Sequence, residues 1–251
     1  MLEYKNVSLS CDGTELLKNI NIGFKKGELT TIIGPNGCGK TTLIQALNGS
    51  SRLTAGEILL DRENYLSFKP RIRAERLSFL PQIRQMIPTL SVRSLVSHGR
   101  FPRLGFSRKM SAHDKELVEE AMRRADVEKY ADQSADTLSG GVRQRAFVAL
   151  QLAQDCDCVV ADEPTTYLDA PSQKQILKIY RNLRDEGRTV ILVLHDIAKA
   201  LEISDRVVVM NDRRIITTGK PDELIGSGII DSVFGVKLKS FSDADGKYYV
   251  L

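Results

Sequence analysis

This sequence contains no long apolar stretch. The chain has 251 residues, and none of its apolar runs reaches the roughly 18 residues that a membrane-spanning helix needs. The N-terminal residues MLEYKNVSLS lack the apolar segment of a secretory signal. We therefore expect a protein without membrane spans that stays in the cytosol.

Cysteine is also scarce. The four cysteines are too few and too irregularly spaced for a disulfide framework. Cys156 and Cys158 fall in one predicted strand, without the second pair that a structural zinc site needs. We interpret them as buried thiols in a reducing compartment.

Repeats, low-complexity tracts and linkers are absent as well. Hydrophobic residues make up 42% and charged residues 27% of the chain, which is typical of a soluble globular protein. The formal net charge of +4 is a small basic excess that a solvated surface explains. We expect no nucleic-acid partner.

What the sequence does have is an alternation of strand and helix patterns. Short apolar runs predict buried strands at residues 29–33, 77–80, 158–161, 190–194 and 206–210. Helical patterns separate the last three of these runs, at residues 171–184 and 197–202. This order predicts an α/β fold whose parallel sheet is covered by helices on both faces.

Two hairpins are expected at the ends of the chain. Residues 2–24 read as an antiparallel pair of strands with a turn at 11–14. Residues 236–251 read as a smaller hairpin that turns at Asp245-Gly246. A helix is expected from Lys40 to about Asn48.

The middle of the chain has a different pattern. Residues 90–154 show helical periodicity and almost no strand signal, with an amphipathic helix at 112–125. This stretch therefore reads as a helical insert in the α/β core. We expect one domain, residues 1–251, built from an α/β core at 1–84 and 156–251 and a helical subdomain at 85–155.

A phosphate-binding loop follows the strand at 29–33. Residues 34–42, GPNGCGKTT, match the pattern G-x-x-x-x-G-K-[ST] between a strand and a helix. Glycines let the backbone wrap a phosphate, Lys40 supplies positive charge, and the Thr41 hydroxyl is a ligand for Mg²⁺. The expected nucleotide-binding residues of this loop are Asn36, Gly37, Cys38, Gly39, Lys40, Thr41 and Thr42.

Polar side chains follow three of the predicted strands. Asp162 and Glu163 come directly after the run 158–161, Gln82 follows 77–81, and His195 follows 190–194. The carboxyl ends of parallel strands face the ligand crevice. We expect Asp162 to hold Mg²⁺ and Glu163 to polarise the attacking water. Gln82 is expected to contact the metal and the water, and His195 the γ-phosphate. His98 and His113, in the helical stretch, are interpreted as structural or exposed.

A second candidate anion site lies at residues 137–145, TLSGGVRQR. Ser139 followed by Gly140 and Gly141 predicts a helix start whose backbone N–H groups are bare. The sequence thus has two phosphate-binding elements in one chain.

Taken in order, GPNGCGKTT, Gln82, LSGGVRQR, VVADEP, Tyr167-Leu168-Asp169 and His195 resemble the motifs of ATP-binding cassette ATPases over essentially the whole chain. The resemblance implies a P-loop NTPase core with a mainly parallel sheet, an N-terminal antiparallel β subdomain and an inserted helical subdomain. It also implies that ATP and Mg²⁺ bind at the phosphate loop of one subunit. The LSGG segment of a second copy, in a head-to-tail dimer, closes each site. In that arrangement Ser139, Gly140 and Gly141 contact the opposing nucleotide, and Asp169 links the two sites.

Other segments indicate a narrower group. The tracts TTYLD at 165–169, VLHDI at 193–197 and GRFP at 99–102 look like those of iron–siderophore, haem and cobalamin importers. That resemblance implies a peripheral subunit on the cytoplasmic face of the membrane. Such a subunit docks on a permease dimer through the surface beside Gln82 and the helical insert. An external substrate-binding protein is then an indirect partner, which acts through the permease.

Two alternative functions remain open on the sequence. One is a soluble cassette in cofactor assembly, such as iron–sulfur cluster building. The other is a cassette that binds ATP as a switch in a scaffold without hydrolysing it. The second alternative is disfavoured because Lys40, Asp162, Glu163 and His195 are all present.

Three positions depart from the family pattern. Cys11 stands where many cassettes have an aromatic residue that stacks on adenine, so we expect weaker adenine selectivity, with Tyr4 as a candidate substitute. Cys38 lies beside Lys40 at a helix start, and both features lower a thiol pKa, so a reactive thiol is one interpretation; the other is a small residue tolerated for its size. Val142 stands where glutamine or glutamate is usual, so the capping box to the backbone N–H of Ser139 is lost.

Overall fold

The computed structural model describes the chain except residues 12, 83–88, 106–108, 167, 244–245 and 251. Tyr167 and the turn residues Asp12 and Asp245 therefore lie outside the described residues. The chain divides into two compact units. We call Met1–Ser67 together with Arg184–Leu251 the terminal unit, and Phe68–Leu183 the middle unit.

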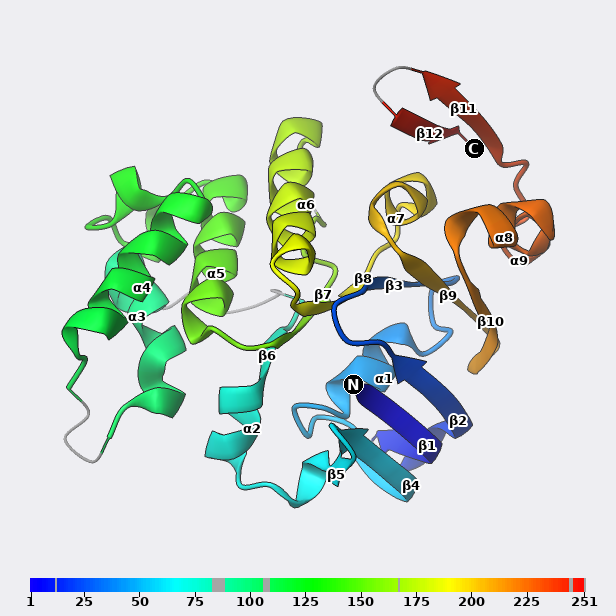
Figure 1. Cartoon of the computed structure of the whole chain (residues 1–251), viewed down its shortest axis with the longest axis horizontal. Coiled ribbons are helices and arrows are strands. Elements are labelled where there is room, and N and C mark those ends of the chain that lie inside the picture. The colour runs from blue at the N-terminus through cyan, green and yellow to red at the C-terminus, as the bar shows by residue number, and fades with distance from the viewer. Residues whose placement is uncertain (12, 83–88, 106–108, 167, 244–245, 251) are drawn as a thin grey trace. The chain divides into compact units, whose positions relative to one another are not determined.

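An antiparallel sheet occupies the N-terminal part of the terminal unit (Figure 1). Its strands run in the order β2-β1-β4-β5. They span Leu2–Cys11 (β1), Thr14–Phe24 (β2), Arg52–Leu60 (β4) and Glu63–Asn64 (β5). The pairing of Cys11 with Thr14 confirms the expected hairpin. β4 is not predicted because its first half is polar and mostly exposed, so it carries no apolar run.

Parallel strands form the centre of the terminal unit. β3 (Leu29–Ile33) pairs in parallel with both β8 (Thr189–Val193) and β9 (Arg206–Asn211), as the apolar runs predict. Every residue of β3 and β8 is buried. β10 (Arg214–Gly219) adds an antiparallel edge next to β9. The sheet is therefore mainly parallel, and β3 leads out of its buried centre into the phosphate loop.

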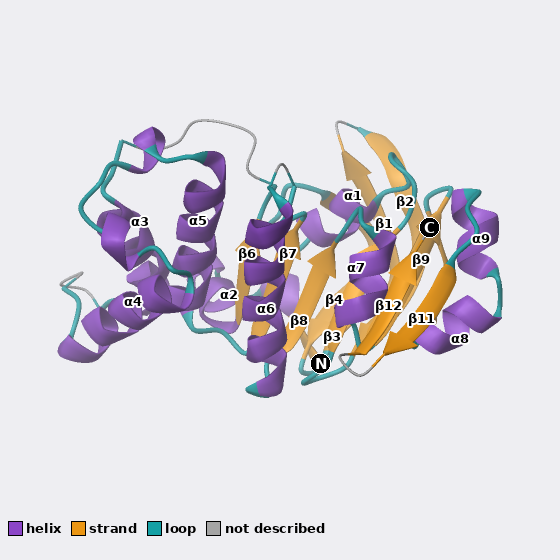
Figure 2. Cartoon of the chain, turned by 90° about the horizontal axis from the view of Figure 1, so that it is seen from above, coloured by secondary structure: helices purple, strands orange, loops and turns teal. Residues whose placement is uncertain are grey.

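Short helices and a C-terminal hairpin complete the terminal unit. They are α1 (Lys40–Gln45), α7 (Ile197–Ile203), α8 (Pro221–Gly226), α9 (Ile229–Phe234), β11 (Lys239–Asp243) and β12 (Gly246–Val250), with a 3₁₀ turn at Tyr65–Ser67. Figure 2 shows the hairpin beside α7, against which β12 packs. α1 ends three residues earlier than expected, because tight turns follow in which the Ser50 and Ser51 N–H groups donate to the Gln45 carbonyl.

The middle unit combines two parallel strands with helices. β6 (Leu77–Leu80) pairs with β7 (Cys158–Asp162), and Leu80 lies opposite Ala161. The helices are α2 (Pro70–Arg76), α3 (Val92–Ser97), α4 (Ala112–Arg124), α5 (Gly140–Gln154) and α6 (Ala170–Asp185), with 3₁₀ segments η2 (His98–Arg103), η3 (Glu128–Tyr130) and η4 (Ala135–Thr137). Figure 1 shows α3, α4 and α5 grouped together. The helical character expected for 90–154 is thus confirmed for its described part.

Close contacts hold η2 against α4 and α5. A Cβ atom at Gly99 would lie 2.4 Å from the Leu150 carbonyl oxygen, so only glycine fits there. Arg100 is 4% exposed, and its guanidinium donates to Asp114 Oδ1 at 2.9 Å and to the Ala153 carbonyl at 2.8 Å. A buried arginine is stable only with such partners. None of the helices in the described ranges is long and apolar enough to cross a bilayer.

Cys156 and Cys158 are buried thiols, as expected; Cys38 is also buried, and Cys11 is half-buried. Cys156 is not in a strand, and that prediction is wrong. Asp155 ends α5 in a left-handed conformation, φ +55°, and Cys156 lies in the connection, where its thiol contacts the Ala74 carbonyl at 3.4 Å. Among the described residues, no cluster of three or more His, Cys, Asp or Glu side chains is placed to hold a metal ion.

Candidate active site

The phosphate loop joins β3 to α1 in the terminal unit. A Cβ atom at Gly34 would lie 2.3 Å from the Met210 carbonyl oxygen. Gly39 precedes α1 with φ +101°, and a Cβ there would lie 2.5 Å from Leu17 Cδ2. Both positions require glycine, because a larger residue would have no room and Gly39 has a left-handed backbone. The loop therefore keeps the tight curve that a phosphate cradle needs.

Lys40 lies folded over this loop. Its side chain is 5% exposed, and Nζ donates to the carbonyl oxygens of Gly34 (2.7 Å) and Pro35 (3.0 Å). Thr41 and Thr42 follow, half-buried, in a first helical turn that carries no acidic residue. The positive charge and the polar groups of the loop are thus concentrated at one point, which suits an anion.

Cys38 does not have the environment that the sequence suggested. Its side chain is 4% exposed, and burial raises the pKa of the thiol, an effect that outweighs the lowering by the Lys40 charge. The alternative of a reactive thiol with a lowered pKa is therefore wrong, and the interpretation as a small tolerated residue agrees with the structure. A buried thiol of raised pKa is a small packing residue of the loop and a poor nucleophile.

Tyr4 is not available to stack on a base. The ring is 1% exposed, meets Phe24 edge-on with centroids 6.2 Å apart, and donates its hydroxyl to the Leu43 carbonyl at 3.1 Å. The suggestion that Tyr4 substitutes for the missing aromatic residue is wrong. Half-buried Cys11, at the end of the β1–β2 hairpin, has no aromatic face to offer.

His195 is exposed in the connection from β8 to α7. The next residue, Asp196, caps α7 by accepting from the Lys199 N–H at 3.0 Å, so the connection has a defined conformation. The other two histidines are structural or exposed, as expected. His98 packs on Phe101 with ring centroids 4.4 Å apart, and His113 is exposed.

In the middle unit, Glu163 and Gln82 are directly bonded. Glu163 is 7% exposed and follows β7 with φ +50°, a left-handed conformation that turns the chain out of the strand. Gln82 Nε2 donates to Glu163 Oε2 at 2.5 Å. Asp162, 1% exposed, is the last residue of β7 itself, one residue beyond the predicted strand end. The structure thus brings together two of the expected catalytic side chains, Gln82 and Glu163, and the expected metal ligand Asp162 directly precedes Glu163 in sequence.

Thr166 is a further contact of this site, one that the sequence pattern does not predict. Its hydroxyl donates to Glu163 Oε2 at 3.1 Å, the same oxygen that accepts from Gln82. In the sequence, Thr166 is recognisable only by its position three residues after Glu163. That spacing predicts a contact only when the left-handed turn at Glu163 is known. Two donors on one carboxylate oxygen fix the orientation of Glu163.

The second anion-binding element has the form that the sequence predicts. Ser139 is the N-cap of α5 and makes no side-chain cap bond, and no acidic residue occurs in the first turn. Ser139 and Gly140 are exposed. A Cβ atom at Gly141 would lie 3.2 Å from Ser172 Oγ, so this glycine closely approaches the start of α6. The bare N–H groups at this helix start are suited to an anion.

Asp169 marks the start of α6. Its Oδ1 accepts from the Ser172 N–H at 3.1 Å, and hydrogen bonds from Ser172 lower the pKa of the carboxyl group. Gln173 holds the preceding turn by donating to the carbonyls of Thr165 (3.2 Å) and Leu168 (2.9 Å). Asp169 is exposed, and its lowered pKa keeps it ionised at neutral pH.

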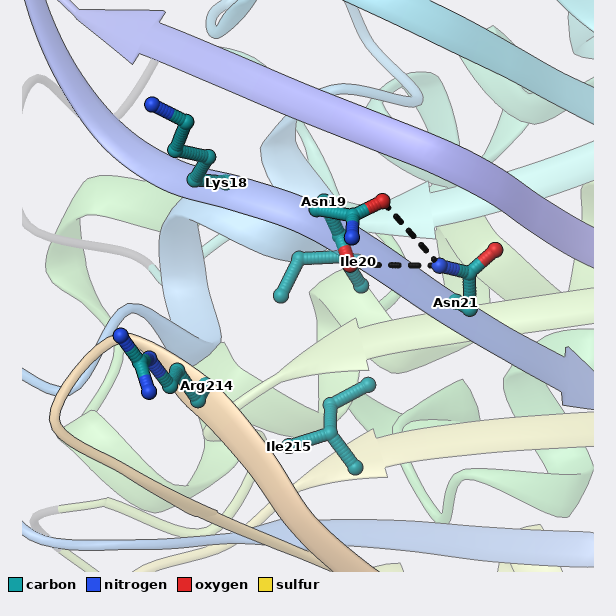
Figure 3. Close-up of a pocket in the computed structure, with 6 residues that line it drawn as sticks. All are labelled: Lys18, Asn19, Ile20, Asn21, Arg214 and Ile215. Carbon is teal, nitrogen blue, oxygen red and sulfur yellow. Dashed lines mark hydrogen bonds between the residues drawn. The ribbon is translucent and has the colours of Figure 1, made fainter.

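A separate groove of about 590 Å³ lies in the terminal unit between β2 and β10 (Figure 3). It is lined by Lys18, Asn19, Ile20, Asn21, Arg214 and Ile215. The Asn21 amide donates to the Asn19 carbonyl at 3.2 Å, and Asn19 has φ +51°, so this strand edge is irregular. Such edges resist pairing with another strand. None of the expected site residues lines the groove.

Comparisons with known proteins agree with these features. Residues 17–166 match the family model described as ABC transporter. The petrobactin import ATP-binding protein FpuD of Bacillus anthracis is 37% identical over 243 residues, 96% of this chain and 89% of that protein. The ferric enterobactin transport ATP-binding protein FepC of Escherichia coli is 34% identical over 227 residues, 90% of this chain and 84% of that protein. The dimeric post-hydrolysis structure of the ATP-binding cassette MJ0796 with ADP and Pi is 29% identical, with a TM-score of 0.78, and covers 88% of this chain and 99% of that chain.

Proposed function

Because the chain belongs to the ABC transporter family, we propose that it is the ATP-hydrolysing subunit of an importer for a metal chelate or cofactor. The cargo class is iron–siderophore, haem or cobalamin. The observation that carries the proposal is the similarity along 96% of the chain to a petrobactin import subunit, supported by the ferric enterobactin relative.

The chemistry is phosphoryl transfer from ATP to water. Lys40 and the loop N–H groups, from Asn36 to Thr42, bind the phosphates, and the exposed His195 donates to a γ-phosphate oxygen. Glu163, oriented by Gln82 and Thr166, accepts a proton from the attacking water. The water oxygen bonds to the γ-phosphorus as the bond to the β-phosphate oxygen breaks, which releases ADP and phosphate.

The donor set for Mg²⁺ consists of hard oxygen ligands. It comprises the Thr41 hydroxyl, the Asp162 carboxylate and the Gln82 amide oxygen, the kinds of atom that Mg²⁺ prefers. The Gln82 bond to Glu163 is consistent with this assignment, because it uses the amide nitrogen and not the amide oxygen. The ion supplies charge neutralisation on the phosphates.

We assign the second anion-binding element to the nucleotide that is bound by the opposite subunit. Ser139, Gly140 and Gly141 contact the nucleotide of a second copy, and Asp169 lies at the contact between the two sites. The dimeric state of the ADP-bound relative supports this arrangement. Two ATP molecules then hold the two copies head to tail, and hydrolysis lets them part.

The partner in the membrane is a permease dimer, which places this subunit on the cytoplasmic face, with an external binding protein delivering the cargo. We assign permease contact to the helical subdomain, residues 85–155, and to α2 beside it in the middle unit. Phe101 is 56% and Ile72 38% exposed, and both lie on segments joined by the Arg71 Nε bond to the Pro102 carbonyl at 2.7 Å. Contiguous exposed apolar surface marks interaction sites, and these two side chains lie on bonded segments.

Substitution of Phe101 tests the permease contact. Phe101→Ala should reduce co-purification with the permease about tenfold, because buried aromatic anchors dominate interfaces. ATPase activity of the isolated subunit should stay within about twofold of the wild type. Phe241→Ala is the matched control, since Phe241 is equally exposed in the terminal unit. Equal loss of co-purification in both variants would contradict the assignment.

Transport itself tests the proposed function. The subunit is purified with its permease, reconstituted in liposomes, and assayed for uptake of ferric siderophores, haem and cobalamin with ATP on its side of the bilayer. Uptake of one of these cargoes that depends on ATP and is lost in Lys40→Ala is expected. A subunit that co-purifies with no polytopic membrane protein, or whose complex takes up none of them, would contradict the proposal.

A further inference from the structure

A buried polar network joins four elements of the middle unit at Gln151. Gln151 lies on α5 and is 4% exposed. Its Nε2 donates to the Val160 carbonyl of β7 at 2.8 Å and more weakly to the Ser78 carbonyl of β6 at 3.5 Å. Its Oε1 accepts from the hydroxyl of Tyr180 on α6 at 2.9 Å. One side chain thus contacts two strands and a second helix.

Burial makes these bonds strong constraints on geometry. Tyr180 has no exposed surface, and burial raises the pKa of its hydroxyl far above the ordinary value, so the group remains a hydrogen-bond donor. A buried polar group that is left without a hydrogen-bond partner destabilises the fold. Any shift of α5 relative to β7 or α6 would break one of these bonds, so the network opposes such shifts.

The four elements are those that carry the assigned middle-unit residues. Glu163 lies three residues after Val160 of β7 in the sequence. Gln82 lies four residues after Ser78 of β6. Gln82 and Glu163 are bonded to each other at 2.5 Å. α5 begins at the LSGG segment, and α6 begins after Asp169.

α5 and α6 are also in contact at their N-terminal ends. Gly141 closely approaches Ser172, and Arg145 Nη1 donates to Gln175 Oε1 at 3.3 Å one turn further along. Gln151 and Tyr180 form the last of these contacts, about 15 Å along α5 from Gly141 at 1.5 Å per residue. The two helices are therefore aligned along most of the length of α5.

We propose that Gln151 is a positioning residue for ATP hydrolysis, acting through the strands that carry Glu163 and Gln82. It fixes the LSGG helix to these strands, so that a movement of the LSGG segment on a partner's nucleotide is transmitted to the Glu163–Gln82 pair of the same chain. The inference rests on the catalytic roles assigned above. The proposed role of Gln151 concerns the turnover rate. Phosphate binding depends on the loop at residues 34–42, in the terminal unit.

Gln151→Met removes the amide while keeping the length of the side chain. It should lower kcat about tenfold or more and leave KM for MgATP within about twofold. Tyr180→Phe, which leaves both amide bonds to the strands, should lower kcat by only about twofold to fivefold. Tyr4→Phe also removes a buried tyrosine hydroxyl bond, but in the terminal unit, and is the matched control with unchanged kcat.

The double variant Gln151→Met/Tyr180→Phe separates positioning from stability. It leaves no buried hydroxyl without its acceptor, so its Tm should recover towards the wild-type value. Positioning predicts that its kcat nevertheless stays low. A double variant that regains both Tm and kcat would overturn the proposal, as would a wild-type kcat in folded Gln151→Met. If Gln151→Met does not fold, the double variant alone decides.

Glu163→Gln, measured alongside, distinguishes a failure of the assigned base from a failure of the positioning role. Wild-type turnover in Glu163→Gln would refute the assigned base, while the comparison of Gln151→Met with the double variant would still report on positioning. Absence of turnover in Glu163→Gln together with wild-type kcat in Gln151→Met would refute only the positioning role.

Discussion

The conformation of single residues decides where the reactive groups lie. Glu163 leaves β7 through a left-handed backbone, so its carboxylate meets Gln82 and Thr166 rather than continuing the alternation of the strand. A non-glycine residue with positive φ carries a strain of about 1–3 kcal/mol that surrounding contacts must offset. The two donors on Oε2 provide such contacts and hold the carboxylate in one orientation.

Cys11 has no aromatic ring on which the base of a nucleotide could stack. Since stacking on an aromatic side chain contributes about 1–3 kcal/mol, Cys11→Tyr should lower KM for ATP about tenfold. GTP should gain as well, because every base has a face to stack. Steady-state hydrolysis of both nucleotides measures this, with Cys11→Ser as the control that adds no ring. An unchanged KM in Cys11→Tyr would show that the base lies elsewhere.

At the scale of elements, α4 depends on an ionised carboxylate at its start. The Ser111 hydroxyl donates to Asp114, and this bond, together with Arg100, lowers the Asp114 pKa to about 2. A depressed folded-state pKa means stability that is present above the ordinary pKa of about 3.9 and lost as pH falls towards 2.

Asp114→Asn should therefore lower Tm by a constant amount above pH 5, because Arg100 loses its buried charge partner. The difference from the wild type should shrink as pH falls from about 4 towards about 2. Thermal unfolding across this range measures it. Asp132→Asn, at a carboxylate that is 94% exposed, is the control. A difference that stays constant down to pH 2 would contradict the role of the ionised Asp114.

The start of α5 lacks its usual side-chain cap. Val142 is the N3 residue after the N-cap Ser139, and the Ser139 side chain makes no cap bond. Val142→Gln restores a capping box, which should tighten ATP-dependent dimerisation about twofold to fivefold, since caps contribute about 0.5–1 kcal/mol. Val142→Met adds length without a cap and should have no effect. Sedimentation with ATP measures both, and equal affinities in the two variants would count against the capping argument.

Some elements of this structure can be predicted from the local sequence pattern, and others cannot. The buried strands β3, β7, β8 and β9 are apolar runs, so local patterning suffices to find them. β4 and β10 are partly exposed and polar, and only their pairing partners define them.

Contacts between distant segments could not be predicted in this way. The bond between Gln82 and Glu163 spans 81 positions, and that between Gln151 and Tyr180 spans 29. The buried state of Cys38 likewise depends on the surrounding fold rather than on its neighbours in sequence. A motif thus predicts which residues take part, and the fold determines their environment.

At the scale of the whole molecule, each chain carries two half-sites for phosphate. The phosphate loop at 34–42 and the LSGG helix start at 139–141 are both suited to anions, and in the proposed head-to-tail dimer each completes a site only with a second copy. On this proposal, function belongs to the dimer, and the reaction cycle is a cycle of association driven by ATP and reversed by hydrolysis.

Glu163→Gln tests this account most directly. The amide keeps the size of the side chain but cannot accept the proton of water, so turnover should fall by at least about a hundredfold while ATP binding persists. Because opening depends on hydrolysis, ATP should convert the variant to a stable dimer of twice the 28.0 kDa chain mass in a sedimentation experiment. Wild-type turnover, or a protein that remains monomeric with ATP bound, would contradict the account.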